Sequence, residues 1–486
     1  MRGRLTLNNW ICYIIDQKNE TSKIYKCRIL GGICIMYDIN DQVFLEKISS
    51  VYPSKRQLQW QEMEFYGFIH YGINQFTNSE WGDGTENPQI FDPQHLDTDQ
   101  WCESLARAEM KGVIMTAKHH DGFCLWDTKF TNHSVMYAPY GKDIVAQLAK
   151  SCKKYDLKLG IYLSPWDRHE PTYGQGEAYD DFFCNQLTEL LTDYGDLFCL
   201  WFDGACGEGP NGKTQYYNWN RYYDLIRKYQ PQAVISVCGP DVRWCGNEAG
   251  HCRTNEWSVV PAELANKEKI QEASQQTDDV AFRERVTSSD EDLGSREFLA
   301  KHDAFIWYPA EVNTSIRPGW FYHEEENEKV RSLEELKSIY LQSVGGNATF
   351  LLNIPPHPDG YFAPQDVNRL ESLGDWIRSS FSYNLLEGGK LRILSNLDDE
   401  FIIRAETKSA ITPKYLILQE DIVLGQQIEY FELLYQENNK WHQATSGTVV
   451  GHKAIRLLDE GISAKEWQLR IIDYRAEPTL ATFALY

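Results

Sequence analysis

Residues 158–203 read KLGIYLSPWDRHEPTYGQGEAYDDFFCNQLTELLTDYGDLFCLWFD, and this stretch decides the fold class. It begins and ends with short apolar runs, Lys158–Leu163 and Leu197–Phe202. Between them, Asp180–Tyr194 has helical periodicity and starts with an Asp that can cap a first turn. A strand, a helix and a second strand in this order predict a parallel pair. Because both runs are nearly all apolar, we expect strands that are buried on both faces.

The same alternation recurs before and after this stretch. Further apolar runs lie at Phe65–Tyr71, Gly112–Ala117 and Ala233–Val237. Further helical stretches lie at Asp97–Met110, Asp143–Tyr155 and Trp219–Tyr229. At least five such units favour a (β/α)8-like TIM barrel in an α/β chain over a doubly wound sheet. Neither GxGxxG nor GxxxxGK[ST] follows any of the runs, which argues against a nucleotide site.

The remainder of the chain changes character twice. Residues 260–303 are polar and charge-rich, which predicts a long loop or mobile insertion. Strand-like runs resume at Ala304–Tyr308 and Thr349–Ile354, and helical stretches at Leu333–Ser343 and Pro364–Phe381 complete a barrel-sized unit. After residue 388, seven short β-like runs separated by turn residues predict a C-terminal β-sandwich. They are Lys390–Ser395, Phe401–Ala405, Tyr415–Gln419, Ile428–Tyr435, Ala454–Leu457, Trp467–Ile472 and Leu480–Leu485.

These patterns predict three parts: an N-terminal extension at 1–50, a catalytic barrel at 51–385 and a β-sandwich at 386–486. The longest apolar stretch near the start, Ile29–Tyr37, is too short to cross a bilayer. No small-x-small cleavage site follows it, so we expect no clear signal peptide and leave the localisation open. The oligomeric state is also left open.

The charge of the chain excludes two classes of partner. The 486 residues include 48 Lys+Arg and 70 Asp+Glu, a net charge of −22. Nucleic acid and anionic membrane surfaces need clustered basic residues, so we expect neither as a partner. The chain also has 15 Trp, of which 11 lie between Trp60 and Trp320. Their concentration in the predicted barrel suggests that some of these Trp rings stack on a ligand.

Chemistry-bearing side chains follow the predicted barrel strands. In a parallel barrel, the carboxyl ends of the strands form the active-site face. His, Trp and carboxylate residues gather there, in the segments His70-Tyr71-Gly72, Lys118–Phe123, Ser164–Asp167, Trp201–Gly204 and Arg243–Glu248. Aromatic faces stack on the C–H surfaces of sugars, and neutral His and carboxylates bind hydroxyls. Glycoside hydrolysis needs two carboxyl groups, so this set favours carbohydrate chemistry.

Each of these residues also has a plainer interpretation. Asp203 can be a helix N-cap, and Glu248 an exposed loop residue. His119 and His120 can be metal ligands, but adjacent residues on a strand point to opposite faces and no HExxH accompanies them. We therefore expect no metal site.

Eight long segments resemble glycoside hydrolase family 29, the α-L-fucosidases. They are GFIHYGINQFTNSEWGDG, AKHHDGFCLWDTKFTNHS, IYLSPWDRH, LWFDGACGEGPNGK, RWCGNEAG, TNEWSVVPAE, WYPAEVNTSIRPGWFYH and FLLNIPPHPDG. The likeness runs from about Tyr52 to the C-terminus. RWCGNEAG and TNEWSVVPAE are similar to the subfamily selective for α-1,3- and α-1,4-linked fucose on branched, Lewis-type glycans.

The resemblance implies a retaining double displacement with Asp203 as nucleophile and Glu248 as acid/base. Glu208 and Glu256 are the rival candidates for the acid/base role. The fucose pocket is expected to consist of His70, Glu80, Trp81, His119, His120, Tyr162, Trp201 and Trp320, with Trp320 facing the fucose methyl group. Arg243 and Trp244 are expected to contact the leaving glycan.

The implied substrate is a fucosylated oligosaccharide, and no cofactor or metal is implied. A broader linkage preference that includes α-1,2, or a catalytically weak fucose-binding barrel, stay as alternatives. Members of the family are commonly periplasmic or secreted.

Overall fold

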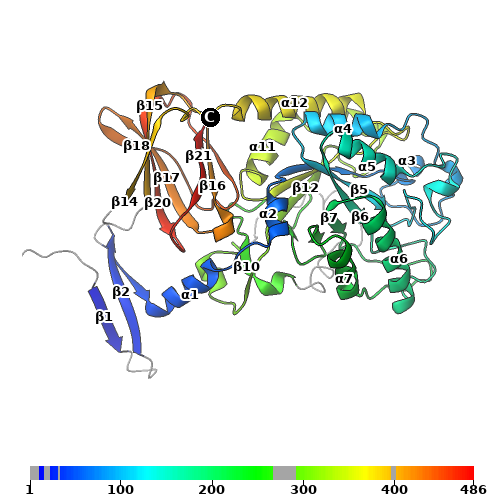
Figure 1. Cartoon of the computed structure of the whole chain (residues 1–486), viewed down its shortest axis with the longest axis horizontal. Coiled ribbons are helices and arrows are strands. Elements are labelled where there is room, and N and C mark those ends of the chain that lie inside the picture. Colours follow the sequence, from blue (N-terminus) through cyan, green and yellow to red (C-terminus); the bar gives the residue numbers. More distant parts are fainter. Residues whose placement is uncertain (1–9, 16–21, 31–32, 266–291, 396–400) are drawn as a thin grey trace, which may run out of the picture.

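A closed ring of parallel strands forms the centre of the larger part of the molecule. The computed structural model describes residues 10–15, 22–30, 33–265, 292–395 and 401–486. Eight parallel strands are hydrogen-bonded in the order β8-β7-β6-β5-β4-β13-β12-β9. A parallel bridge between Ser236 of β8 and Val242, directly before β9, brings the two end strands together, so the sheet closes into a barrel and confirms the predicted fold class (Figure 1).

The barrel strands have the following bounds: β4 Phe65–Ile69, β5 Gly112–Lys118, β6 Lys158–Leu163, β7 Leu197–Phe202, β8 Val234–Val237, β9 Arg243–Trp244, β12 Ala310–Ser315 and β13 Thr349–Asn353. The outer helices are α4 Thr98–Arg107, α5 Ile144–Lys154, α6 Glu177–Asp193, α7 Trp219–Tyr229, α11 Leu333–Ser343 and α12 Pro364–Phe381. Short helices α2 Lys55–Gln61 and α3 Asn74–Thr77 lie before and after β4.

The expected Asp caps hold for two helices and fail for one. Asp97 accepts a hydrogen bond from Gln100 N at the start of α4, and Asp143 accepts one from Ala146 N at the start of α5. Helix α6 instead begins three residues before Asp180, after Gly176 with φ of 62°. Asp180 is buried inside the first turns, where it accepts from Asn218 N, so its role is to hold the chain entering α7.

The prediction was wrong about two barrel strands. The Ala304–Tyr308 run forms β11 Phe305–Trp307, which pairs antiparallel with β10 Val259–Pro261 outside the barrel. The two barrel strands that were not predicted are β9 and β12. Both lack an apolar signal: β9 has only two residues, and β12 reads AEVNTS although all six of its residues are buried. Residues 238–242 alone join β8 to β9, so no helix follows β8.

The predicted insertion at 260–303 is partly structured. Its described residues include η3 Ala262–Ala265 and α10 Arg296–Leu299, while 266–291 lie outside the described residues.

Two antiparallel sheets form the C-terminal part. One has the order β14-β15-β20-β17-β18 and the other β19-β16-β21. Their bounds are β14 Lys390–Ser395, β15 Phe401–Ile411, β16 Tyr415–Glu420, β17 Ile428–Glu437, β18 Lys440–Gly447, β19 Ala454–Leu457, β20 Ala464–Tyr474 and β21 Leu480–Leu485. Side chains of both sheets, such as Leu416, Leu433 and Trp467, share one buried cluster, as in a β-sandwich. Strand β18 was missed because five of its eight residues are polar.

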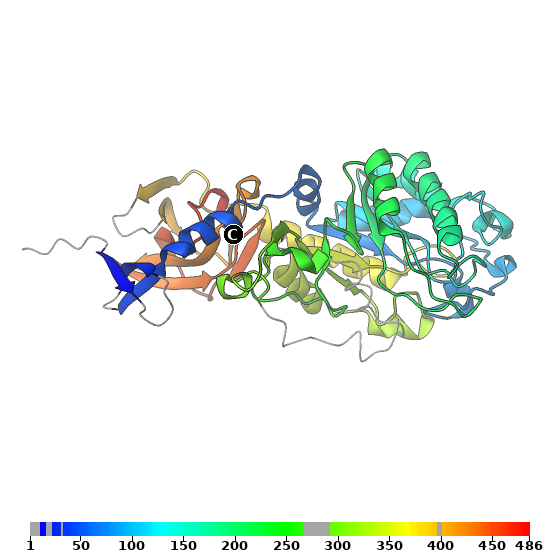
Figure 2. The same ribbon diagram turned by 90° about the horizontal axis from the view of Figure 1, so that it is seen from below.

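The sandwich lies beside the barrel (Figure 2). Glu64, just before β4, pairs with Lys453 at 2.6 Å and with His452 at 3.0 Å. At the end of α12, Phe381 packs against Tyr415 and Tyr486. These contacts brace the barrel wall, away from the carboxyl ends of its strands.

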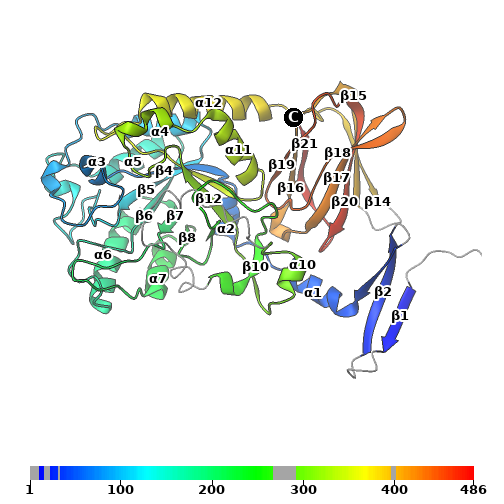
Figure 3. The ribbon, with the colours of Figure 1, turned by 180° about the vertical axis from the view of Figure 1, so that it is seen from behind.

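The N-terminal residues form a separate small sheet and a docked helix. Strands β1 Trp10–Ile15, β2 Ser22–Leu30 and β3 Ile33–Asp38 are antiparallel, and β1 and β2 project from the body (Figure 3). Helix α1 Ile39–Ser49 follows, and its Ile48 is buried against Val259, Trp307 and Ile422. Among the described residues, no helix has the length and apolar character needed to cross a membrane.

Candidate active site

Asp203 lies directly after β7, at the carboxyl end of the barrel. Its Oδ1 accepts a hydrogen bond from Ala205 N at 2.9 Å, and its Oδ2 accepts one from the Tyr162 hydroxyl at 3.1 Å. His120 Nε2 lies 3.9 Å from the same Oδ2. The Asp203 side chain is 28% exposed, so one edge of the carboxylate faces the open end of the barrel. Asp203 opens a loop rather than a helix, which removes the N-cap interpretation.

Two buried imidazoles have a defined tautomer beside Asp203. The Ser164 hydroxyl donates to Trp166 O at 2.6 Å, so its oxygen must accept from His120 Nδ1 at 2.7 Å. The Asn353 amide nitrogen donates to two oxygens, so its Oδ1 accepts from His70 Nδ1 at 2.9 Å. Burial lowers the pKa of His70 and of His120 to about 4. Both rings are therefore neutral at pH 7 and have Nε2 left as a hydrogen-bond acceptor.

His119 and His120 lie together, contrary to the expectation that they diverge. Their ring centroids are 4.0 Å apart. Strand β5 ends at Lys118, so neither residue follows the alternation of a strand. The described residues hold no cluster of three or more His, Cys, Asp or Glu side chains placed to bind a metal ion. Burial lowers the pKa of His119 well below its usual range, and its ring stacks on Tyr162 at 5.7 Å.

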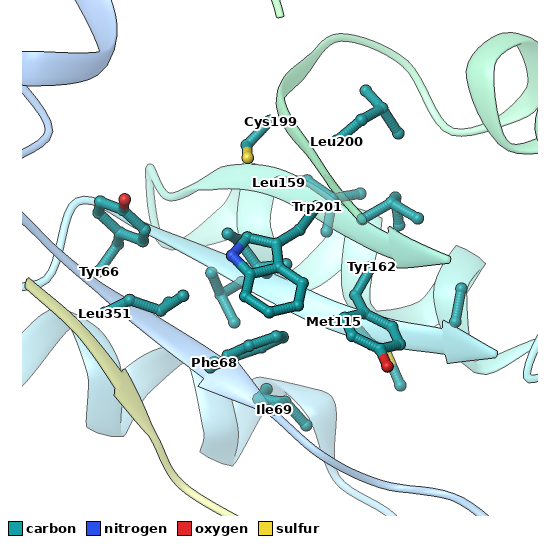
Figure 4. Close-up of a cluster of buried hydrophobic side chains, with 14 of the residues drawn as sticks. Tyr66, Phe68, Ile69, Met115, Leu159, Tyr162, Cys199, Leu200, Trp201 and Leu351 are labelled. Atoms are coloured by element: carbon teal, nitrogen blue, oxygen red, sulfur yellow. The ribbon is translucent and has the colours of Figure 1, made fainter. Parts of the chain in front are cut away.

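The aromatic floor of the site comes from neighbouring strands. Tyr162 on β6 and Trp201 on β7 are partners in the parallel register, and their rings stack with centroids 5.3 Å apart. Phe68 packs against both (Figure 4). Trp81 lies edge-on to His120 at 5.3 Å and to Trp166 at 5.4 Å. The expected pocket residues from β4 to β7 therefore form one continuous surface around Asp203.

Glu80 holds the loop that carries Trp320. Its carboxylate accepts from the backbone N–H of Trp320 at 2.9 Å and of Phe321 at 3.2 Å, and it pairs with His323 Nε2 at 2.7 Å. Trp320 thereby packs 5.1 Å from the His70 ring. These three contacts make Glu80 a support for the loop that carries Trp320.

Glu248 meets this surface through Trp320. The indole Nε1–H of Trp320 donates to Glu248 Oε2 at 3.2 Å. Both residues line a hollow of about 290 Å³. The other lining residues are Thr314, Ser315, Arg317, Pro318, Lys329, Val330, Arg331 and Glu335. Glu248 is therefore a half-buried carboxyl group at a cavity, not a solvated loop residue.

The rival carboxylates lie in other settings. Glu256 is fully buried in an ion pair with Arg243, and it also accepts from Arg253 N. Burial in this pair argues against an acid/base role for Glu256. Glu208 is exposed in the loop after β7.

The same ion pair decides where Arg243 points. Arg243 is buried and also donates to Tyr308 O and Trp257 O. Contact of Arg243 with the leaving glycan stays a prediction. Trp244 is half-buried, and its Nε1–H donates to Asn313 Oδ1 at 2.8 Å.

The sequence interpretation missed several residues that support the site. Ser164 and Asn353 set the tautomers of His120 and His70. Ser164 was among the residues quoted after its strand but was given no role, and Asn353 stands at the end of β13, where the same rule would have found it. His323 pairs with Glu80 from within a quoted motif. Glu311, a buried carboxylate on β12, had no signal because β12 itself was not recognised.

A stability measurement tests the protonation state of His120. The pKa of His120 is about 4 in the fold against an ordinary value near 6.5. Between pH 6.5 and pH 4 the unfolded chain binds a proton on His120 that the folded chain does not bind. Protonation therefore favours the unfolded chain, and the free energy of unfolding falls as the pH falls. We expect the free energy of unfolding of the protein, minus that of His120→Gln, to fall by up to about 3 kcal/mol from pH 7 to pH 4. A difference that is constant over this range would show a charged or solvated His120.

Comparisons with known proteins place this geometry in one family. A family model described as Alpha-L-fucosidase matches residues 48–380. The chain is 36% identical to "Alpha-L-fucosidase 1" of Arabidopsis thaliana, over 89% of this chain and 87% of that protein. Its fold is similar to a candidate α-L-fucosidase from Bacteroides ovatus (TM-score 0.82, 42% identity, 92% of this chain and 76% of that one). It is also similar to a Ruminococcus gnavus GH29 fucosidase in complex with fucose (TM-score 0.76, 26% identity, 90% and 95%). The chain therefore belongs to the α-L-fucosidase family, glycoside hydrolase family 29, and is a glycoside hydrolase.

Proposed function

We propose that the protein is a retaining exo-α-L-fucosidase that releases terminal α-1,3- or α-1,4-linked L-fucose from branched oligosaccharides or glycoconjugates. The observation that carries this proposal is the setting of Asp203. A carboxylate with one open edge, held on its other sides by Ala205 N and the Tyr162 hydroxyl, is oriented for attack on an anomeric carbon.

The reaction takes two displacements at one carbon. Asp203 Oδ attacks the anomeric carbon while Glu248 gives its proton to the departing glycosidic oxygen, which leaves as a hydroxyl of the shortened glycan. Glu248, now a carboxylate, then takes a proton from water as that water attacks the fucosyl ester and releases Asp203. The Trp320 Nε1–H can only donate a hydrogen bond, and it donates to Glu248 Oε2. This bond restrains the orientation of the Glu248 carboxyl group.

The pocket suits an uncharged deoxy sugar. The neutral His70 and His120 offer Nε2 acceptors to ring hydroxyls, which a protonated imidazole cannot do. Tyr162, Trp201 and Trp320 supply apolar faces for the C–H surface and the methyl group of fucose.

The hollow beside Glu248 lies on the leaving-group side of the reaction. A proton donor must lie next to the glycosidic oxygen, so the rest of the glycan extends from Glu248. The hollow holds both donors and acceptors, among them Lys329, Arg331 and the Thr314 hydroxyl. Such a mixture matches a saccharide rich in hydroxyl groups.

A comparison of linkages tests the substrate assignment. We expect kcat/KM on a Lewis trisaccharide to exceed that on 2′-fucosyllactose by at least about 10-fold, because an α-1,2 link directs the remaining glycan away from polar groups that then stay unpaired. Equal values would favour the broader linkage preference. Fucose binding by calorimetry with no turnover of either glycan or of 4-nitrophenyl α-L-fucoside would favour a fucose-binding barrel.

A further inference from the structure

A carboxylate is buried inside the barrel beneath the aromatic floor. Glu311, on β12, has no exposed surface. It accepts hydrogen bonds from the Tyr66 hydroxyl at 2.6 Å, from Trp201 Nε1 at 2.7 Å and from Ser236 Oγ at 3.2 Å. These partners stand on β4, β7 and β8, so one side chain connects four strands across the interior. Neither the nucleophile nor the acid/base role accounts for it.

The bond to Trp201 is directional. An indole has one polar atom, which can only donate, so a 2.7 Å bond to a fixed carboxylate sets the rotation of the whole ring. Trp201 Nε1 and Ser236 Oγ both meet Glu311 Oε1, while Tyr66 takes Oε2. Burial raises the pKa of Glu311, whereas these three donors favour its charged form.

The orientation of Trp201 reaches Asp203 through one stacked ring. The Trp201 and Tyr162 rings lie 5.3 Å apart with an interplanar angle of 23°. The Tyr162 hydroxyl donates to Asp203 Oδ2. In Figure 4 the indole nitrogen faces Tyr66, while the Tyr162 hydroxyl lies on the other side of the floor. Glu311 therefore acts on one edge of the stack and Asp203 is held at the other.

We propose that Glu311 is a positioning residue for fucoside cleavage: its carboxylate fixes the Trp201 ring, and through the stacked Tyr162 it fixes the hydroxyl that holds Asp203. This inference rests on the proposed role of Asp203. A displacement of about 1 Å in a reacting group costs about 10²-fold in rate, so loss of this restraint acts on turnover and not only on stability.

A purely structural role makes a different prediction. A carboxylate that only connects four strands would affect the folded fraction, with each folded molecule fully active. Glu420 is a matched case: it is also a buried Glu, at the end of β16, and it accepts from three backbone N–H groups of Gln427, Ile428 and Gly451. It lies in the sandwich, so Glu420→Gln is the control for the loss of a buried charge.

The test measures kcat and KM per folded molecule on 4-nitrophenyl α-L-fucoside, with thermal unfolding alongside. We expect Glu311→Gln to lower kcat by about 10- to 100-fold with KM changed less than about 3-fold, and Glu420→Gln to leave both unchanged. In a Trp201→Phe background, which lacks the Nε1–H, Glu311→Gln should add little further loss. Wild-type kcat in Glu311→Gln, or losses that multiply in the double variant, would overturn the proposal.

Two further variants keep the proposal testable if Glu311→Gln fails to fold or if the proposed function itself is wrong. If Glu311→Gln does not fold, Trp201→Phe alone decides, since unchanged kcat there would show that the Nε1–H bond is not needed. Asp203→Ala is assayed in parallel. Activity retained in Asp203→Ala would overturn the proposed function itself, whereas activity lost there and kept in Glu311→Gln would overturn only the positioning role.

Discussion

Asp203→Ala is expected to lower kcat/KM on 4-nitrophenyl α-L-fucoside by about 10³-fold or more. Without the carboxylate no fucosyl ester forms, and the remaining pocket can only bind the sugar. The variant should fold, because the Asp203 side chain is 28% exposed and its removal costs two hydrogen bonds, those from Tyr162 and Ala205 N. The loss should appear in kcat, with fucose binding by calorimetry retained.

Glu208→Ala is the matched control for this loss. Glu208 is an exposed carboxylate in the same loop, and its removal should change kcat/KM less than about 3-fold. Near wild-type activity in Asp203→Ala would reject the nucleophile assignment, whereas a large loss in Glu208→Ala would favour Glu208 as the acid/base residue.

Glu248→Ala is expected to lower kcat/KM on a Lewis trisaccharide by about 10²- to 10⁴-fold. A sugar hydroxyl is a poor leaving group and needs the proton that Glu248 donates. The loss should be smaller on 4-nitrophenyl α-L-fucoside, because 4-nitrophenolate leaves without protonation. Azide should restore turnover of the aryl substrate, since it attacks the fucosyl-enzyme without a general base, and α-fucosyl azide should accumulate.

Glu256→Ala is the control for this second prediction. Its removal leaves the buried Arg243 without the carboxylate of its ion pair. We therefore expect a less stable protein whose activity does not respond to azide. Azide rescue of Glu256→Ala or Glu208→Ala, and none of Glu248→Ala, would move the acid/base role to the rescued residue.

Sequence periodicity predicts the elements whose buried residues are nearly all apolar. Strands β6 and β7 are apolar at nearly every position and were predicted with their observed bounds, as was helix α7. Strand β12 was not, because its polar residues face the barrel interior and hydrogen-bond there, as Glu311 does. Helix α6 begins earlier than predicted, because Gly176 and not Asp180 provides its start.

The candidate site was predictable where a residue type alone carries the chemistry. Asp203 and the pocket aromatics follow strand ends or lie in quoted motifs, and the structure brings them together. The settings of the two acid/base candidates were not predictable: Glu248 contacts Trp320, 72 positions away in the chain, and Glu256 pairs with Arg243, 13 positions away. No local pattern encodes such pairs, which join Glu248 and Glu256, both in loops, to residues elsewhere in the chain.

The central claim, that Asp203 forms a covalent fucosyl-enzyme, is tested most directly by trapping that ester. The protein is treated with 2-deoxy-2-fluoro-α-L-fucosyl fluoride, which slows the second displacement, and the labelled peptide is sequenced by tandem mass spectrometry. The account predicts one added 2-fluorofucosyl group per chain, on Asp203 and not on Glu208. A label on any other residue, or turnover that releases β-L-fucose first with no label, would contradict it.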